Sequence, residues 1–108
     1  MSEKQFISIC KVEEVPVGEV RVFEPEDDIR VAICNIDGQL FAVDDLCTHD
    51  DGPLGEGDLD GFCIECPRHG ALFDVRTGEV VRLPATVGIG TYATRVNNGE
   101  VQVEIELD

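Results

Sequence analysis

Apolar and polar residues alternate with a period of two along several segments of this chain. In the last of them, Val101, Val103, Ile105 and Leu107 are separated by single polar residues. This spacing places one face of a strand in a core and the other in water. No segment shows the 3.6-residue period of a helix over a useful length. The pattern therefore predicts an all-β protein.

Short β-prone runs recur between turn signals. The expected strands are residues 5–10, 20–23, 29–36, 40–43, 62–65, 91–96 and 100–107, and Thr77-Gly78 predicts a turn between residues 71–75 and 79–81. Asp37-Gly38 predicts a tight hairpin between two of them, and the acidic stretch 24–28, which contains Pro25, predicts a solvated loop. We expect an antiparallel β-sandwich or small barrel, with residues 1–108 forming one domain.

The chain is strongly acidic: it has 108 residues and a net charge of −15, from 23 acidic and 8 basic residues. Nucleic acid and anionic membrane surfaces are therefore poor partners, and a basic protein surface is a good one. No apolar run approaches the roughly 18 residues that span a bilayer. The first residues lack the regions of a signal peptide, so we expect a cytoplasmic protein.

Acidic residues gather between positions 44 and 65, with no lysine or arginine among them. They are Asp44, Asp45, Asp50, Asp51, Glu56, Asp58, Asp60 and Glu65. Charges of one sign steer the encounter with a partner of the opposite sign. We expect this stretch to take part in docking.

Five cysteines, an odd number with no secretory signal, argue against a disulfide framework. Cys10, Cys34 and Cys63 lie in β-prone runs. We expect Cys34 to be buried as a small apolar side chain and Cys63 to point into a core. Cys63 also forms a Cys-x-x-Cys pair with Cys66, which is compatible with a zinc ribbon.

The remaining cysteines belong to two Cys-His pairs. Cys47-Thr48-His49 is followed by sixteen residues and then by Cys66-Pro67-Arg68-His69. Thiolates and imidazoles at such spacing are typical of a metal site. Two cysteines and two histidines can hold one zinc ion, or a [2Fe–2S] cluster in which histidines replace the cysteines on one iron.

The second alternative is favoured by a resemblance to a known family. The order Cys-x-His and Cys-x-x-His, with Pro67 and Gly70 at the second pair and Phe73 beyond it, resembles the Rieske motif. The chain length is similar to that of the Rieske ferredoxins of bacterial aromatic-ring-hydroxylating dioxygenases. The resemblance implies a Rieske fold with an inserted, loop-rich cluster-binding subdomain at about residues 45–84.

The resemblance also implies the ligands of one Rieske [2Fe–2S] cluster. Cys47 and Cys66 would bind one iron through thiolates, and His49 and His69 would bind the other through imidazoles. Leu83-Pro84 resembles the loop that covers the cluster in this family.

The implied function is one-electron transfer rather than catalysis. Electrons would come from a flavin-dependent NAD(P)H ferredoxin reductase and go to a terminal oxygenase with a basic docking surface, and a monomer is expected. Three alternatives remain open: the small subunit of an assimilatory nitrite reductase, a structural zinc module for protein interaction, and the Rieske domain of a larger oxygenase.

A low reduction potential is expected within this family. High-potential members carry two additional cysteines that form a disulfide, where this chain has Gly52 and Arg68, and a serine where it has Ala71. Without that hydroxyl, a sulfide of the cluster loses a hydrogen bond that favours the reduced state.

Overall fold

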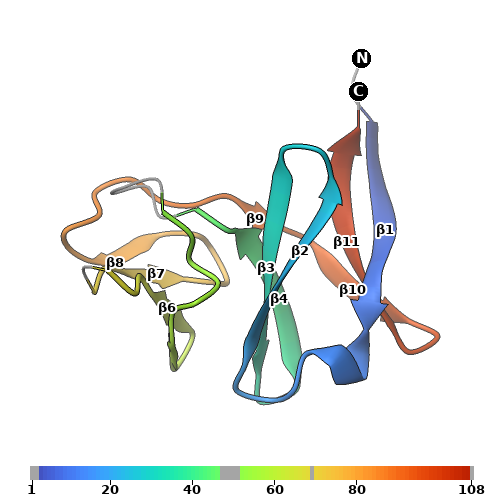
Figure 1. The fold of residues 1–108 in the computed structure, drawn as a ribbon, viewed down its shortest axis with the longest axis horizontal. Helices are drawn as coiled ribbons and strands as arrows, with labels where there is room; N and C mark the ends of the chain where they lie inside the picture. Colours follow the sequence, from blue (N-terminus) through green and yellow to red (C-terminus); the bar gives the residue numbers. More distant parts are fainter. Residues whose placement is uncertain (1–2, 47–51, 69, 108) are drawn as a thin grey trace.

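Two antiparallel sheets form the base of the molecule in the computed structural model, which describes residues 3–46, 52–68 and 70–107 (Figure 1). One sheet has the strand order β1-β11-β10 and the other β2-β3-β4-β9. The bounds are β1 Glu3–Lys11, β2 Val20–Glu26, β3 Ile29–Ile36, β4 Gln39–Asp44, β9 Thr91–Tyr92, β10 Thr94–Asn97 and β11 Glu100–Leu107. Outside the strands, the described residues contain one short 3-10 helix at Val12–Glu14 and no α-helix.

A third sheet is inserted between β4 and β9 and has the strand order β5-β6-β7-β8. Its strands are short: β5 Leu59–Asp60, β6 Cys63–Glu65, β7 Leu72–Asp74 and β8 Val80–Arg82. The chain leaves the base at the end of β4 and returns at β9, which pairs directly with β4. Figure 1 shows this sheet at one side of the base. The expected insertion is therefore present.

The β3–β4 hairpin separates two apolar cores. Ala32, Cys34 and Ile36 of β3 belong to the core shared with the inserted sheet, whereas Val31 and Ile33 belong to the core shared with β1 and β11. Successive side chains of a strand point to opposite faces, so one strand can supply both cores. This explains why residues 31–36 read as a nearly unbroken apolar run.

Two hairpin turns follow the sequence signals. Asp37 and Gly38 have φ values of 54° and 91°, and Asn98 and Gly99 have 53° and 77°. Positive φ at both central residues is the geometry that Asp-Gly and Asn-Gly favour between antiparallel strands. In β11, the side chains of Val101, Val103 and Ile105 are fully buried, as their alternation predicts.

The predicted acidic loop at residues 24–28 is wrong over its first half. β2 continues to Glu26, and only Asp27 and Asp28 form the turn. Pro25 is accommodated because β2 lies at the edge of its sheet and its register with β3 shifts between Phe23 and Glu26. Edge strands and bulges are the places where a sheet tolerates proline.

The single strand predicted at residues 91–96 is two strands. β9 pairs with β4, and β10 pairs with β11 in the other sheet. The break falls at Ala93, whose carbonyl oxygen accepts a hydrogen bond from the backbone N–H of Glu104. The chain thus passes from one sheet to the other here, which local sequence does not reveal. Within the described residues, no helix has the length and apolarity to cross a membrane.

Candidate metal centre

Of the four predicted ligands, the structure describes Cys66. Cys47, His49 and His69 lie outside the described residues, as do Asp50 and Asp51. Among the residues that are described, no three or more potential ligands converge on a common point. The residues on either side of the two predicted ligand segments are described, and their contacts define the surroundings of the centre.

Cys66 lies at the end of β6 and begins the second loop. Its backbone N–H donates to the carbonyl oxygen of Ala71 at 2.7 Å, and the N–H of Gly70 donates back to the Cys66 carbonyl oxygen at 3.0 Å. Gly70 has a φ of 76°, a conformation that glycine adopts without steric cost. These bonds hold the backbone of Cys66 beside Gly70 and Ala71.

The Cys66 side chain is only 1% exposed and belongs to the same core as Leu54, Ile64 and Phe73. A thiolate is a soft ligand and suits iron in an iron–sulfur cluster. A cysteine held at the boundary between this core and a closed loop therefore fits the group implied by the sequence motif.

Arg82 of β8 braces the second loop from its other side. Its Nε donates to the Gly70 carbonyl oxygen at 2.8 Å, and its Nη2 pairs with Glu65 Oε2 at 2.7 Å. The side chain of Arg82 is 52% exposed, so this pair is partly screened by water. It nevertheless places a positive charge beside Gly70.

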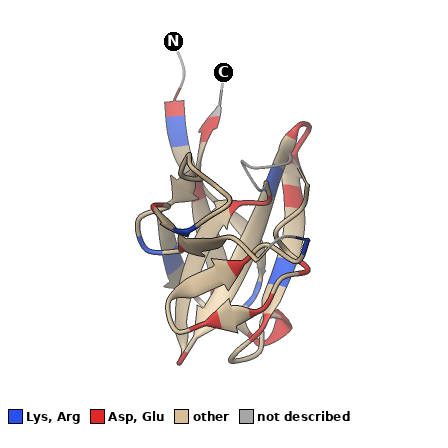
Figure 2. Ribbon diagram, turned by 90° about the vertical axis from the view of Figure 1, so that its left-hand side faces the viewer, with Lys and Arg blue, Asp and Glu red and all other residues tan. Residues whose placement is uncertain are grey.

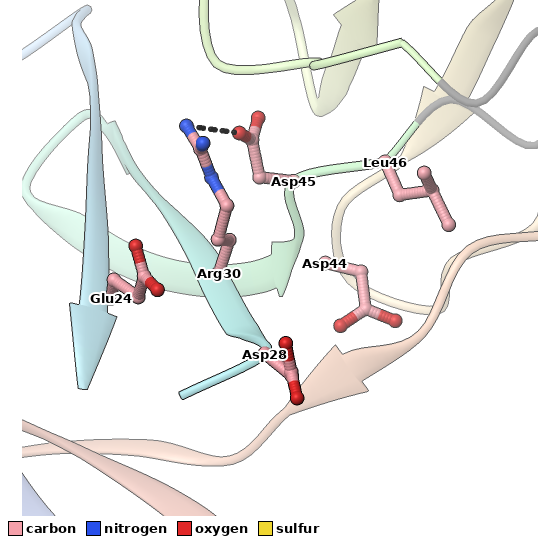
Figure 3. Close-up of a pocket in the computed structure, with 6 residues that line it drawn as sticks. All are labelled: Glu24, Asp28, Arg30, Asp44, Asp45 and Leu46. Atoms are coloured by element: carbon pink, nitrogen blue, oxygen red, sulfur yellow. Dashed lines mark ion pairs between the residues drawn. The ribbon is translucent and has the colours of Figure 1, made fainter. Parts of the chain in front are cut away.

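The first loop leaves β4 at Asp45 and returns at Leu54 and Gly55. Oδ1 of Asp45 accepts hydrogen bonds from the backbone N–H groups of both returning residues, at 2.9 and 2.6 Å. Oδ2 pairs with Arg30 Nη2 at 3.2 Å, which Figure 3 shows as a dashed line. The sequence predicts that Asp45 takes part in docking as a member of the acidic stretch, and it indicates no role for Arg30, because these contacts are not local in the chain.

An open pocket of about 460 Å³ lies beside this loop (Figure 3). Its lining combines four carboxylates with one guanidinium and one apolar side chain: Glu24, Asp28, Arg30, Asp44, Asp45 and Leu46. One oxygen of Asp44 accepts a short hydrogen bond from the Tyr92 hydroxyl. Burial, followed by the bond to Asp44, raises the pKa of Tyr92, so the phenol stays protonated at neutral pH.

The acidic stretch at residues 44–65 is less uniform in space than in sequence. Arg30 pairs with Asp45, and Arg82 pairs with Glu65, so two of its carboxylates have basic partners from other strands. Figure 2 faces this end of the molecule and shows acidic residues spread over it with a few basic ones between them. This end of the molecule remains acidic, although Arg30 and Arg82 neutralise part of its charge.

The cysteines not assigned as ligands have thiols that resist ionisation. Burial, with a smaller contribution from Glu14, raises the pKa of Cys10 to about 11, and burial raises that of Cys34 to about 12. Burial is also the main cause of a raised pKa at Cys63. Metal ligation requires thiolate, so these environments do not favour it. The predicted burial of Cys34 is confirmed.

The expectation that Cys63 points into a core is wrong. Cys63 is partly exposed, and its neighbour Ile64 is the β6 residue that is fully buried. Adjacent residues of a strand face opposite sides, so only one of the two can enter the core.

Comparison with known proteins identifies the family. The model of the Rieske [2Fe-2S] domain matches residues 5–93. The chain is a Rieske protein. Its cofactor is therefore one Rieske-type [2Fe–2S] cluster, and the zinc alternative is excluded.

Its relatives are ferredoxins of similar length. A 3-phenylpropionate/cinnamic acid dioxygenase ferredoxin subunit from Photorhabdus laumondii is 42% identical over 90% of this chain and 91% of its own length. The Sphingomonas yanoikuyae B1 ferredoxin superposes with a TM-score of 0.87 at 36% identity, covering 94% and 99% of the two chains. Like these relatives, this Rieske protein is an electron-transfer component and not itself an enzyme.

Two further structures bear on partners and alternatives. A chain in the complex of reduced oxygenase and oxidized ferredoxin of carbazole 1,9a-dioxygenase matches with a TM-score of 0.85 at 36% identity, over 91% of both chains. A putative nitrite reductase small subunit from Mycobacterium tuberculosis matches with a TM-score of 0.82 at 19% identity, over 97% and 96%. The latter likeness shows a shared fold alone.

Proposed function

We propose that this Rieske protein is the soluble, cytoplasmic ferredoxin of an aromatic-ring-hydroxylating dioxygenase system. It accepts one electron from a flavin-dependent NAD(P)H reductase and delivers it to a terminal oxygenase, acting as a monomer. The observation that carries this proposal is similarity over 90–91% of the chain to dioxygenase ferredoxins, one of which is in a solved complex with its oxygenase.

The ligands of this proposal are Cys47 and Cys66 on one iron and His49 and His69 on the other, within a cluster-binding subdomain at residues 45–84. The enclosed position of Cys66 and the closed loop that follows it support this assignment. When bound, the cluster takes up and returns a single electron. The protein's contribution is to hold the two loops at a fixed separation and to set the charge around them.

A low reduction potential belongs to the same proposal. Ala71 is fully buried and has no hydroxyl to donate to a sulfide, and nearby carboxylates oppose the uptake of negative charge. Arg82, beside the second loop, acts in the opposite direction. We expect the balance to leave the midpoint near the bottom of the Rieske range of about −150 to +300 mV.

The test is a redox titration of the purified protein at neutral pH, followed by EPR of the reduced state. We expect a red-brown protein with the low average g-value of a mixed histidine–cysteine cluster and a midpoint near the bottom of that range. A midpoint well above 0 mV would move the protein toward the respiratory class and contradict the assignment to a dioxygenase system.

Docking to a basic surface of the oxygenase is supported by the acidic pocket beside Leu46 and by the overall negative charge. Long-range attraction acts mainly on the association rate and is screened by salt. We therefore expect electron transfer to slow as ionic strength rises from low to moderate values, and to slow at low salt in the double variant Asp50→Lys with Asp51→Lys. An electron-transfer rate that is unaffected by both ionic strength and the double substitution would argue against electrostatic docking.

A further inference from the structure

A single buried carboxylate joins the two ends of the first ligand loop. Asp45 precedes Cys47 by two residues, and the side chain of Asp45 has no exposed surface. Its Oδ1 accepts from the N–H groups of Leu54 and Gly55, on the returning side of the loop. The residue that precedes the segment with Cys47 and His49 thus accepts hydrogen bonds from two residues that follow that segment.

The ion pair with Arg30 offsets the free-energy cost of burying the Asp45 carboxylate. The guanidinium of Arg30 reaches Oδ2 of Asp45 at 3.2 Å, and the Arg30 carbonyl oxygen accepts the Asp45 backbone N–H at 3.0 Å. The Arg30 side chain is 58% exposed, so it spans from water to the enclosed carboxylate. A buried charge that loses its partner is strongly destabilising, which makes Arg30 and Asp45 one unit.

Leu54 and Gly55, at the returning end of the loop, pack against one of the two cores and against β2. Leu54 is fully buried in the core that also contains Cys66. Gly55 lies against Val22 of β2 so closely that a Cβ at this position would collide with the valine side chain. The hydrogen bonds that Asp45 accepts therefore connect the first loop to the core that contains Cys66 and to β2 of the base.

We propose that Asp45, held in place by Arg30, is a positioning residue that sets the geometry of the first ligand loop relative to Cys66. This inference rests on the proposed ligand assignment. Groups that orient ligands without touching the metal alter metal retention by roughly 10–100-fold when they are removed. A loop whose ends are released samples more conformations, and the ligands it carries then leave the metal more readily.

Three variants separate the parts of this unit. Asp45→Ala removes both the acceptor and the charge. Asp45→Asn keeps an oxygen that can accept from Leu54 and Gly55, and it removes the charge. Arg30→Ala leaves both hydrogen bonds in place and removes the partner of the carboxylate.

Asn35 supplies a matched control at the opposite end of the same β3–β4 hairpin. Asn35 and Asp45 are the two buried polar residues within the described part of the chain. The Asn35 side chain donates to the Val15 carbonyl oxygen at 2.7 Å and accepts from the Gly38 N–H at 2.9 Å. Asn35→Ala therefore breaks a comparable clasp that encloses no ligand.

The measurements are the rate of bleaching of the visible absorption with an iron chelator, well below the unfolding temperature, and the EPR spectrum of the reduced protein. We expect Asp45→Ala to lose its cluster roughly tenfold faster than the wild type and to give a broadened or shifted spectrum. The bleaching rate of Asp45→Asn should lie between those of the wild type and Asp45→Ala. Arg30→Ala should bleach faster than the wild type. Asn35→Ala should lower the melting temperature but bleach at the wild-type rate with an unchanged spectrum.

Equal bleaching of Asp45→Ala and Asn35→Ala at similar melting temperatures would overturn the positioning role, since general stability would then explain the effect. If Asp45→Ala does not fold, wild-type bleaching and spectra in both Asp45→Asn and Arg30→Ala would overturn it equally. The ligand assignment fails independently of these results: a native cluster spectrum in Cys47→Ala would refute it, whatever Asp45 does.

Discussion

The two halves of the molecule are stabilised in different ways. The base contains long strands, with nine residues in β1 and eight in both β3 and β11, paired in long ladders that are each interrupted by at most one register shift. The strands of the inserted sheet have two or three residues each. There, side chains such as Asp45 and Arg82 hold the backbone of the loops directly.

This difference shows how the protein fixes the positions of residues in the two loops of the metal centre. Long ladders fix a scaffold, but they cannot place ligands from two separate loops, because ladder geometry follows the sheet. Short strands leave the loops free to take the shape that a metal centre requires, and individual hydrogen bonds then fix that shape. Changes in the two halves should therefore differ in their effect on the cluster more than in their effect on folding.

The largest expected difference is between cysteines. Cys66→Ala should abolish assembly of a native cluster, whereas Cys63→Ala, three residues away on β6, should assemble one with at most a loss of stability. The comparison uses the visible absorption and the acid-labile sulfide content of the two purified variants. A folded, colourless Cys63→Ala protein would show that the ligand assignment is wrong.

A second comparison truncates one fully buried side chain in each core. Phe73→Ala in the core of the inserted sheet should cost about 3–5 kcal/mol of unfolding free energy, and Ile105→Ala in the base core about 2–5 kcal/mol. In urea, Phe73→Ala should lose its visible absorption before its far-ultraviolet circular dichroism. Ile105→Ala should lose both signals together. If Phe73→Ala instead lost its circular dichroism before its visible absorption, the base would be the less stable half.

The smallest effect concerns the two buried thiols, one in each core. Each pKa is raised from its ordinary value of 9.0, to about 11 for Cys10 and about 12 for Cys34. Above pH 9 the unfolded chain releases these protons while the native protein retains them, so stability present below pH 9 is lost as pH rises. Each thiol contributes a slope of at most about 1.4 kcal/mol per pH unit.

Replacing Cys34 by alanine should remove its share of that slope up to about pH 12, and replacing Cys10 should remove its share up to about pH 11. Unfolding free energies in denaturant at several alkaline pH values, under reducing conditions, give the slopes. Identical slopes in the wild type and in both variants would contradict the assigned pKa values.

Local signals in the sequence predicted much of the fold. The turn at Asp37-Gly38 and the alternation in β11 follow from residues close together in the chain. The extension of β2 through Pro25 and the division of residues 91–96 did not, because both depend on which neighbouring strand is available.

The same limit applies to the centre. The spacing of cysteines and histidines indicated a metal site, and the resemblance of that spacing and its flanking residues to the Rieske motif predicted the cofactor. The pairing of Arg30 with Asp45 and the bracing of Gly70 by Arg82 join residues that only the folded sheets bring together. Supporting contacts of this kind carry no spacing signature, so the sequence alone does not reveal them.

The pairing of β1 with β11 has a practical consequence. Glu3, at the start of β1, is opposite Leu107, at the end of β11. Figure 1 shows this end of the two strands away from the inserted sheet. A tether, a fluorescent domain or an electrode linker joined beyond either residue would therefore emerge on the side remote from the redox end. The molecule could be immobilised by one terminus and still present its cluster to a partner in solution, which would let interfacial electron transfer be measured with the protein in a defined orientation.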